Sequence, residues 1–281
     1  MHPWKKIIIN FSFFILLSHS SQAQRNIPCY ESVEARVWAD SVFKAMSYYE
    51  KMGQLFMVDA FSNKDAAHVA QITQLIDSFK IGGLIFFQGG PLRQANLTNF
   101  YQSRSKIPLM IGIDGEWGLS MRLDSTIRFP RQMTLAAGAS AHDVYEMGVD
   151  IATQCKRMGI HINFAPDVDI NNNPNNPIIN SRAFGESKEK VALYGLSYMK
   201  GMQDHQVLAC AKHFPGHGDT DTDSHLALPI VNATVDRLDS LELFPFKKLI
   251  PQGLASVMVA HLFIPELDST LDQPSSLSTK L

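Results

Sequence analysis

The fourteen residues from Lys212 to His225 form the densest group of proton-transferring side chains in this sequence. They include three histidines, three aspartates and one lysine, and they follow directly on the apolar run of residues 207–211. An apolar run that opens into a polar, titratable loop is typical of a buried strand that ends in a catalytic loop. The segment therefore predicts acid–base chemistry at the end of a strand.

Asp223 and His225 are the residues of this loop best suited to act as an acid–base pair. An aspartate two residues away can orient the imidazole, fix its tautomer and stabilise its cation, which makes the histidine a usable acid or base near neutral pH. The loop also offers His213, His217, Asp219 and His225 as metal ligands. Because no regular metal-ligand spacing is present, we favour the acid–base pair and expect neither a metal nor an organic cofactor.

Helical and strand patterns alternate along the chain after residue 30. Six strands are expected as near-continuous apolar runs, over residues 54–58, 83–87, 108–113, 160–165, 207–211 and 255–259. Strands without polar alternation are typical of parallel sheets that are buried on both faces. Helices are expected between and before them, over residues 31–51, 65–79, 92–106, 141–158, 187–205 and 238–250.

Polar residues cluster where these strands end, at residues 114–116, 167–180, 212–225 and at His261. The carboxyl ends of the strands are where (β/α)₈ barrels assemble their active sites. The pattern therefore predicts an α/β fold, a (β/α)₈ TIM-type barrel that is incomplete because only about six β/α units are present. A doubly wound open sheet is the alternative, and it is disfavoured because no glycine-rich phosphate-binding motif follows the first strand.

Residues 1–23 have the features of a cleaved secretory signal peptide. Two lysines precede the apolar run of residues 7–17, and small residues stand before a cleavage site after Ala23. The run is shorter than the about 20 residues that a membrane span needs. We therefore expect export to the periplasm or the exterior without membrane association after cleavage, a helical segment over residues 24–50 and the barrel domain over residues 51–281.

The composition is that of a globular protein, with 45% hydrophobic and 19% charged residues in a chain of 281. The formal net charge of −2 and the lack of a basic stripe argue against a nucleic-acid partner. Three cysteines are too few for a disulfide framework, and Cys155 and Cys210 lie in apolar runs that predict core positions.

Three segments together resemble the N-terminal domain of glycoside hydrolase family 3, in its bacterial β-N-acetylglucosaminidase branch. Residues 212–225 resemble the signature Lys-His-Phe-Pro-Gly-His-Gly-Asp-Thr…Asp-Ser-His of that branch. Residues 113–122 resemble its Asp-x-Glu-Gly-Gly…Arg segment, and residues 163–185 resemble its Asn-Phe-Ala-Pro…Asp-Arg-Ser-Phe-Gly stretch. The first of these motifs is highly specific for the family.

The resemblance implies a role for each matching residue. His225 is the proton donor and acceptor, and Asp223 is its partner. The residues that bind the sugar are Asp114, Arg122, Arg182, Lys212 and His213. Charge-assisted hydrogen bonds from such groups can fix sugar hydroxyls. Structural roles are the alternatives for three residues: Arg122 as a surface charge, Arg182 as an anchor for the Asn-rich loop, and Asp169 as a hydrogen-bonding residue behind the site.

Two departures from the family pattern matter. Trp117 stands where the family has a glycine, and it either borders the sugar or packs in the core, with packing slightly favoured. The family's nucleophile is an aspartate on the loop after the seventh strand, whereas this sequence ends after the sixth. Neither Asp268 nor Asp272 is expected to replace it, so we expect a C-terminally truncated chain with little or no hydrolytic activity of its own.

The resemblance implies a retaining glycosidase that releases terminal β-linked N-acetylglucosamine from a carbohydrate substrate such as peptidoglycan fragments. A histidine in place of the usual carboxylic acid lessens like-charge repulsion with the nucleophile and can admit anionic acceptors, so phosphate is an alternative to water as the acceptor. Two alternatives remain, an exported non-catalytic sugar-binding module and a family 3 β-glucosidase, although the β-glucosidase branch generally lacks the Asp-Ser-His loop.

Overall fold

The computed structural model describes residues 32–222, 227–270 and 273–280. The expected signal peptide and the Asp223–His225 pair lie outside the described residues, as does Asp272. Among the residues that are described, no helix combines the length and the apolar character needed to cross a membrane.

Six parallel strands form one sheet, and their order in the sheet is their order in the chain. They are β1 (Met57–Phe61), β2 (Gly83–Gln88), β3 (Met110–Ile113), β4 (Ile162–Asn163), β5 (Leu208–Phe214) and β6 (Ser256–Val259). A doubly wound sheet would reverse the strand order at its middle. The sequential order excludes that alternative and confirms the expected barrel-type arrangement of six β/α units.

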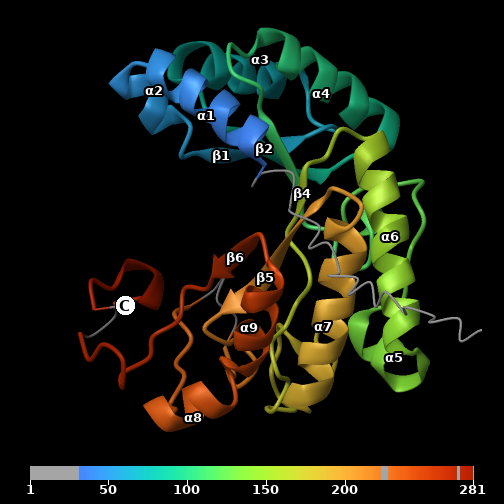
Figure 1. Ribbon diagram of the computed structural model, residues 1–281, viewed down its shortest axis with the longest axis vertical. Coiled ribbons are helices and arrows are strands. Elements are labelled where there is room, and N and C mark those ends of the chain that lie inside the picture. Colours follow the sequence, from blue (N-terminus) through green and yellow to red (C-terminus); the bar gives the residue numbers. More distant parts are fainter. Residues whose placement is uncertain (1–31, 223–226, 271–272, 281) are drawn as a thin grey trace, which may run out of the picture.

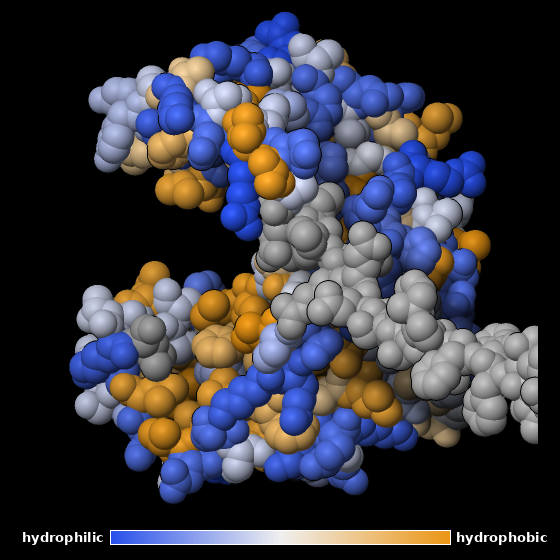
Figure 2. Space-filling model, viewed as in Figure 1, coloured by the Kyte–Doolittle hydropathy of each residue, from blue (hydrophilic) through white to orange (hydrophobic). Residues whose placement is uncertain are grey.

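Most of the helices lie along the outer face of the curved sheet, whereas the first one lies at the amino-terminal edge of the sheet (Figure 1). The helices are α1 (Val33–Ala45), α2 (Tyr48–Gly53), α3 (Ala66–Gln74), α4 (Pro91–Arg104), α5 (Gln132–Gly138), α6 (Ala141–Arg157), α7 (Lys188–Gln203), α8 (Val235–Ser240) and α9 (Phe244–Leu249). In the described part of the chain, β1 and β6 each pair with one neighbour only. The sheet is therefore open between these two strands, and Figure 2 shows the opening as a deep notch with apolar side chains on its rims.

Two strand boundaries differ from those expected. The first strand begins at Met57 because the preceding residues belong to the end of α2, where the amide of Gln54 donates to the carbonyl of Glu50. The apolar run alone did not separate this helix end from the strand. The fourth strand is reduced to Ile162–Asn163, because the chain soon reaches Pro166, which has no N–H to donate to a neighbouring strand.

Two expected helices are each divided. The first is interrupted at Ser47, which forms a capping box with Glu50 and so begins a new helix, α2. The helix expected over residues 238–250 consists of α8, α9 and a final 3₁₀ turn. Helix α5 was not expected, and it matters for the site because Gln132 in its first turn bonds to the loop after β4.

The main core fills the space between the sheet and its helices, with large buried side chains such as Phe86, Tyr101 and Tyr198. Cys155 and Cys210 are both buried and unpaired, which confirms the expected core positions. A smaller apolar cluster lies near β6 around Val231, Leu238 and Leu262.

Helices α6 and α7 make close contact through two glycines. A Cβ atom on Gly201 would lie 2.2 Å from the carbonyl oxygen of Tyr145, and one on Gly148 would lie 2.7 Å from that of Tyr198. Neither carbonyl can move without moving its helix. The absence of a side chain at both positions thus sets the distance between the two helices, which lie side by side in Figure 1.

We expect Gly201→Ala to lower the free energy of unfolding by about 1–3 kcal/mol, because the methyl group forces the two helices apart. The gain in helix propensity, about 1 kcal/mol, is too small to offset a large separation. Gly138→Ala is the matched control, since a Cβ there meets nothing within 4 Å, and it should be neutral or stabilising. Urea unfolding of both variants tests this, and equal stabilities would contradict it.

Candidate active site

Titratable side chains from three neighbouring strands meet at the carboxyl edge of the sheet. Asp114 and Glu116 follow β3, Asp167 and Asp169 follow β4, and Lys212 and His213 form the end of β5. Arg122 and Arg182 reach the same place from loops. The structure therefore brings together all five residues that the sequence predicts to bind the sugar.

Lys212 lies at the centre of this cluster and is 1% exposed. Its Nζ lies 2.5 Å from Asp114 Oδ1 and 2.7 Å from Glu116 Oε1. Burial disfavours the charged form, but the two adjacent carboxylates outweigh it and raise the pKa of Lys212 above its ordinary value. The ammonium group thus stays charged and holds the two acidic residues together.

Both arginines make ion pairs with these same acidic residues. Arg122 bonds to the Asp114 carboxylate, and its Nε donates to the Asp114 carbonyl at 3.0 Å. Arg182 holds Glu116 in a bidentate pair, with distances of 2.7 and 2.9 Å. Although burial opposes ionisation of Glu116, Lys212 and Arg182 keep its pKa below the ordinary value. Arg182 also donates to the carbonyl of Ile178, so it anchors the Asn-rich loop as well.

The ring of His213 lies between the side chains of Asp169 and Arg182. Its Nδ1 lies 2.6 Å from Asp169 Oδ2, and its Nε2 lies 3.2 Å from Arg182. The register of β5 against β6 shifts between Lys212 and Phe214, an irregularity of the kind that redirects side chains. The two successive residues Lys212 and His213 therefore both contact the cluster, rather than pointing to opposite faces of the sheet.

Asp167 is fully buried, and its Oδ2 accepts no hydrogen bond in the described residues. Burial and the nearby charge of Asp169 raise the pKa of Asp167 well above its ordinary value. Asp167, Asp169 and His213 place ligand atoms within 4.8 Å of one another, a spacing that can hold a cation. The guanidinium of Arg182 already supplies the positive charge there, 3.7 Å from Asp167 Oδ2.

Buried neutral side chains fix the loops that carry these residues. Asn163, at the end of β4, exchanges two hydrogen bonds with the backbone of Gly115, at 2.9 and 3.1 Å. The hydroxyl of Tyr198 on α7 donates toward the carbonyls of Gly115 and Glu116. Gln132 on α5 pairs with the backbone of Asp167 in the same way. The position of each acidic side chain is thus set by the core below it.

The loop after β5 is fixed as far as Thr220. Asn176 donates to the carbonyl of His217 at 2.8 Å and to the hydroxyl of Thr220 at 3.3 Å. Gly218 passes so close to the preceding loop that a Cβ atom would lie 1.8 Å from the carbonyl of Ile170. Asp223 and His225 come three and five residues later and lie outside the described residues, so their roles stay predictions.

Four residues of the cluster were not predicted to bind the sugar from the sequence. Glu116 and Asp167 were assigned no role, His217 was considered only as a metal ligand, and Asp169 was left between a sugar ligand and a hydrogen-bonding residue behind the site. The signal for the acidic residues was present, because Asp114 and Glu116, like Asp167 and Asp169, are pairs two residues apart just after a strand.

Trp117 is half-buried, with the Arg131 guanidinium 4.6 Å from the centre of its ring.

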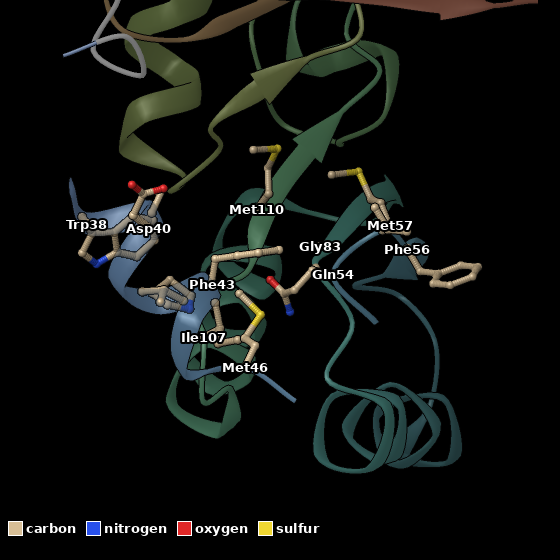
Figure 3. Close-up of a pocket in the computed structure, with 15 residues that line it drawn as sticks. Trp38, Asp40, Phe43, Met46, Gln54, Phe56, Met57, Gly83, Ile107 and Met110 are labelled. Atoms are coloured by element: carbon tan, nitrogen blue, oxygen red, sulfur yellow. The ribbon is translucent and has the colours of Figure 1, made fainter. Parts of the chain in front are cut away.

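A separate groove lies at the opposite, amino-terminal edge of the sheet (Figure 3). Its lining is mainly apolar and comes from α1 and from the starts of the first three strands, including Phe43, Met57, Gly83 and Met110. Asp40 is the charged residue of the lining. Since acid–base chemistry needs several converging polar groups, this groove does not compete with the cluster as a candidate active site.

Comparison with known proteins decides the family. Residues 47–281 match the Glycosyl hydrolase family 3 N terminal domain, and this range is most of the chain. The chain belongs to this family. The match includes every residue of the cluster described above.

Individual members of glycosyl hydrolase family 3 are similar over much of this chain. β-Hexosaminidase A of Pseudoalteromonas piscicida is 38% identical over 216 residues, which are 71% of this chain and 36% of that protein. The structure of a family 3 β-N-acetylglucosaminidase from Paenibacillus sp. str. FPU-7 matches with a TM-score of 0.77 and 37% identity, over 84% of this chain and 46% of that one.

A third similar protein has a different activity in its name. The β-glucoside phosphorylase BglX bound to 2FGlc matches with a TM-score of 0.82 and 26% identity, over 90% of this chain and 47% of that one. The chain thus spans less than half the length of all three proteins. These family 3 structures confirm the expected fold.

Proposed function

We propose that the protein is a retaining glycoside hydrolase that releases terminal β-linked N-acetylglucosamine. The observation that carries the proposal is the division of the cluster into exposed and buried groups. The side chains of Asp114, Arg122, Arg182 and His213 are between 14% and 22% exposed, whereas those that hold them from behind are at most 1% exposed, namely Glu116, Lys212 and Asp169. A ligand can therefore reach the first set, while the second set keeps it in place.

The charge balance of the cluster favours a neutral, polyhydroxylated ligand. Each of the cations Arg122, Arg182 and Lys212 is already paired with a carboxylate. Little positive charge is left to attract an anionic ligand, but the partly exposed groups still offer donors and acceptors to hydroxyl groups. The names of two of the similar proteins, a β-hexosaminidase and a β-N-acetylglucosaminidase, support N-acetylglucosamine as the sugar.

In the proposed mechanism His225 protonates the departing glycosidic oxygen, while Asp223 orients its ring. An aspartate on the loop after a seventh strand attacks the anomeric carbon, and water then releases the sugar with His225 as the base. Asp268 is unsuited to the attack, because its carboxylate accepts hydrogen bonds from Lys280, Ser278 and the amide of Thr270. We further propose export of the protein and peptidoglycan fragments as its natural substrate.

The full-length protein should hydrolyse an aryl β-N-acetylglucosaminide faster than the matching aryl β-glucoside. Release of the aryl group from both substrates, measured at equal concentration, tests the sugar preference. Titration with N-acetylglucosamine by calorimetry tests binding independently. Binding without turnover of either substrate would support a non-catalytic sugar-binding module instead, and faster turnover of the glucoside would support a β-glucosidase.

Phosphorolysis is a second candidate reaction, and the similarity to β-glucoside phosphorylase BglX favours its inclusion. The same assay with added inorganic phosphate separates the two reactions. We expect free N-acetylglucosamine as the product at every phosphate concentration, because the cations of the cluster are already neutralised. Formation of a sugar 1-phosphate would show that phosphate replaces water as the acceptor.

A further inference from the structure

Asp169 is buried behind His213 and accepts three hydrogen bonds from N–H groups. Its Oδ2 contacts His213 twice, at 2.6 Å from Nδ1 and 3.2 Å from the backbone amide, and its Oδ1 accepts from the amide of His217 at 2.6 Å. Both oxygens accept from backbone amides, which is the arrangement expected of an ionised carboxylate that acts as an acceptor only. The proton in its bond to the imidazole therefore belongs to Nδ1 of His213.

The other nitrogen of His213 faces a group that can only donate. Arg182 lies 3.2 Å from Nε2, and a guanidinium has no acceptor. A second proton, on Nε2, would make the ring a cation. Its N–H group would then face the N–H groups of the Arg182 guanidinium, which is also a cation. The lone pair of Nε2 must consequently point toward Arg182, which leaves the neutral ring with its proton on Nδ1.

We infer that Asp169 is a positioning residue that locks His213 in the Nδ1–H tautomer, so that Nε2 is an acceptor at the mouth of the site. The substrate part of this inference rests on the proposed function. A sugar hydroxyl that enters between the two side chains donates its proton to Nε2 and accepts from Arg182. The pair thereby recognises a group that is both donor and acceptor, a requirement that a hydroxyl meets and a fluorine does not.

Asp167 provides a matched comparison for this role. It is as buried as Asp169 and also lies near the ring, but its Oδ2 is 3.9 Å from His213 Nδ1, too far for a hydrogen bond. If the presence of a buried carboxyl group near the ring were enough to determine the tautomer, the two aspartates would act alike. If the hydrogen bond determines it, only Asp169 matters.

The tautomer can be measured without any ligand, by ¹⁵N NMR of the full-length protein labelled in its histidines. His213→Gln identifies the signals of His213 by their loss. We expect a protonated Nδ1 and an unprotonated Nε2, unchanged in Asp167→Asn. In Asp169→Asn the carboxamide has one acceptor for three donors, so we expect protonation at Nε2 to increase. A wild-type ring protonated at Nε2, or an unchanged His213 spectrum in Asp169→Asn, would overturn the inference.

Kinetics test the substrate part separately. In Asp169→Asn, KM for the aryl β-N-acetylglucosaminide should rise about tenfold with a smaller change in kcat, because a binding hydrogen bond is lost. Among the monodeoxyfluoro analogues of N-acetylglucosamine, one should bind about tenfold more weakly to the wild type but not to His213→Gln. Equal losses in both proteins would contradict hydroxyl recognition by His213. A wild type that binds and hydrolyses no glycoside would refute the proposed function, whereas the NMR result would still decide the tautomer.

Discussion

Replacement of His225 by alanine should lower kcat of the full-length protein by about 10²–10⁴-fold and change KM far less. General acid–base catalysis acts on the transition state, whereas the partly exposed groups Asp114, Arg122, Arg182 and His213 are proposed to bind the sugar in the ground state. A loss confined to kcat is the kinetic signature of that division. Steady-state hydrolysis of an aryl β-N-acetylglucosaminide with a poor leaving group is the measurement, because such a substrate depends most on protonation of the departing oxygen.

His142→Ala is the matched control for this experiment. His142 lies on α6 with an exposed side chain, and it contacts no residue of the cluster. Its replacement should leave kcat and KM unchanged. Asp223→Asn should fall between the two, because the acid–base residue remains but loses the carboxylate that orients it. Unchanged turnover in His225→Ala would refute the assignment of His225 and with it the proposed mechanism.

Replacement of Lys212 by methionine should lower the free energy of unfolding by about 3–5 kcal/mol. Methionine has a similar length but no charge, so Asp114 and Glu116 would face each other in a buried site without their shared cation. Removal of one partner from a buried ion pair costs more than the pair itself contributes, because the remaining charge stays out of water. Sugar binding should be lost as well, since the position of Asp114 depends on Lys212.

The cost of Lys212→Met should depend on pH. In the wild type, Lys212 helps to hold the pKa values of Asp114 and Glu116 below their ordinary values, despite the opposing effect of burial. A lowered pKa in the folded state contributes stability above the pKa of the unfolded chain, about 4, and this contribution is lost as the pH falls. The difference between wild type and variant should thus be largest at neutral pH and shrink below about pH 4.

Urea unfolding at several pH values measures this dependence, with Lys156→Met as the control. Lys156 is exposed on α6, where it bonds to Gln206 on the surface, and its loss should cost less than about 1 kcal/mol. A Lys212→Met protein as stable as the control at neutral pH would show that the cluster does not depend on a buried cation.

Much of the fold was predictable from the sequence, because each β/α unit contains an apolar run that is followed by polar residues. The buried strands are continuous apolar runs, and four of the six expected runs coincide closely with observed strands. The first and the fourth differ. The residue types at positions 54–56 are compatible with either the end of α2 or the start of β1. The hydrogen bond of Gln54, which caps the end of α2, places them with the helix. Likewise, the capping box at Ser47 divides a helix whose apolar spacing is continuous.

The family, the order of the β/α units and five of the residues that converge at the carboxyl edge of the sheet could be predicted from the sequence. These features depend on motifs and on the spacing of residues that are close to one another in the chain. How the charges are paired, in contrast, depends on the tertiary structure. Lys212 and Asp114 are 98 positions apart in the chain, and Arg182 and Glu116 are 66 positions apart. Such pairs form because parallel strands bring their carboxyl ends together in a buried edge, where each charge must find a partner.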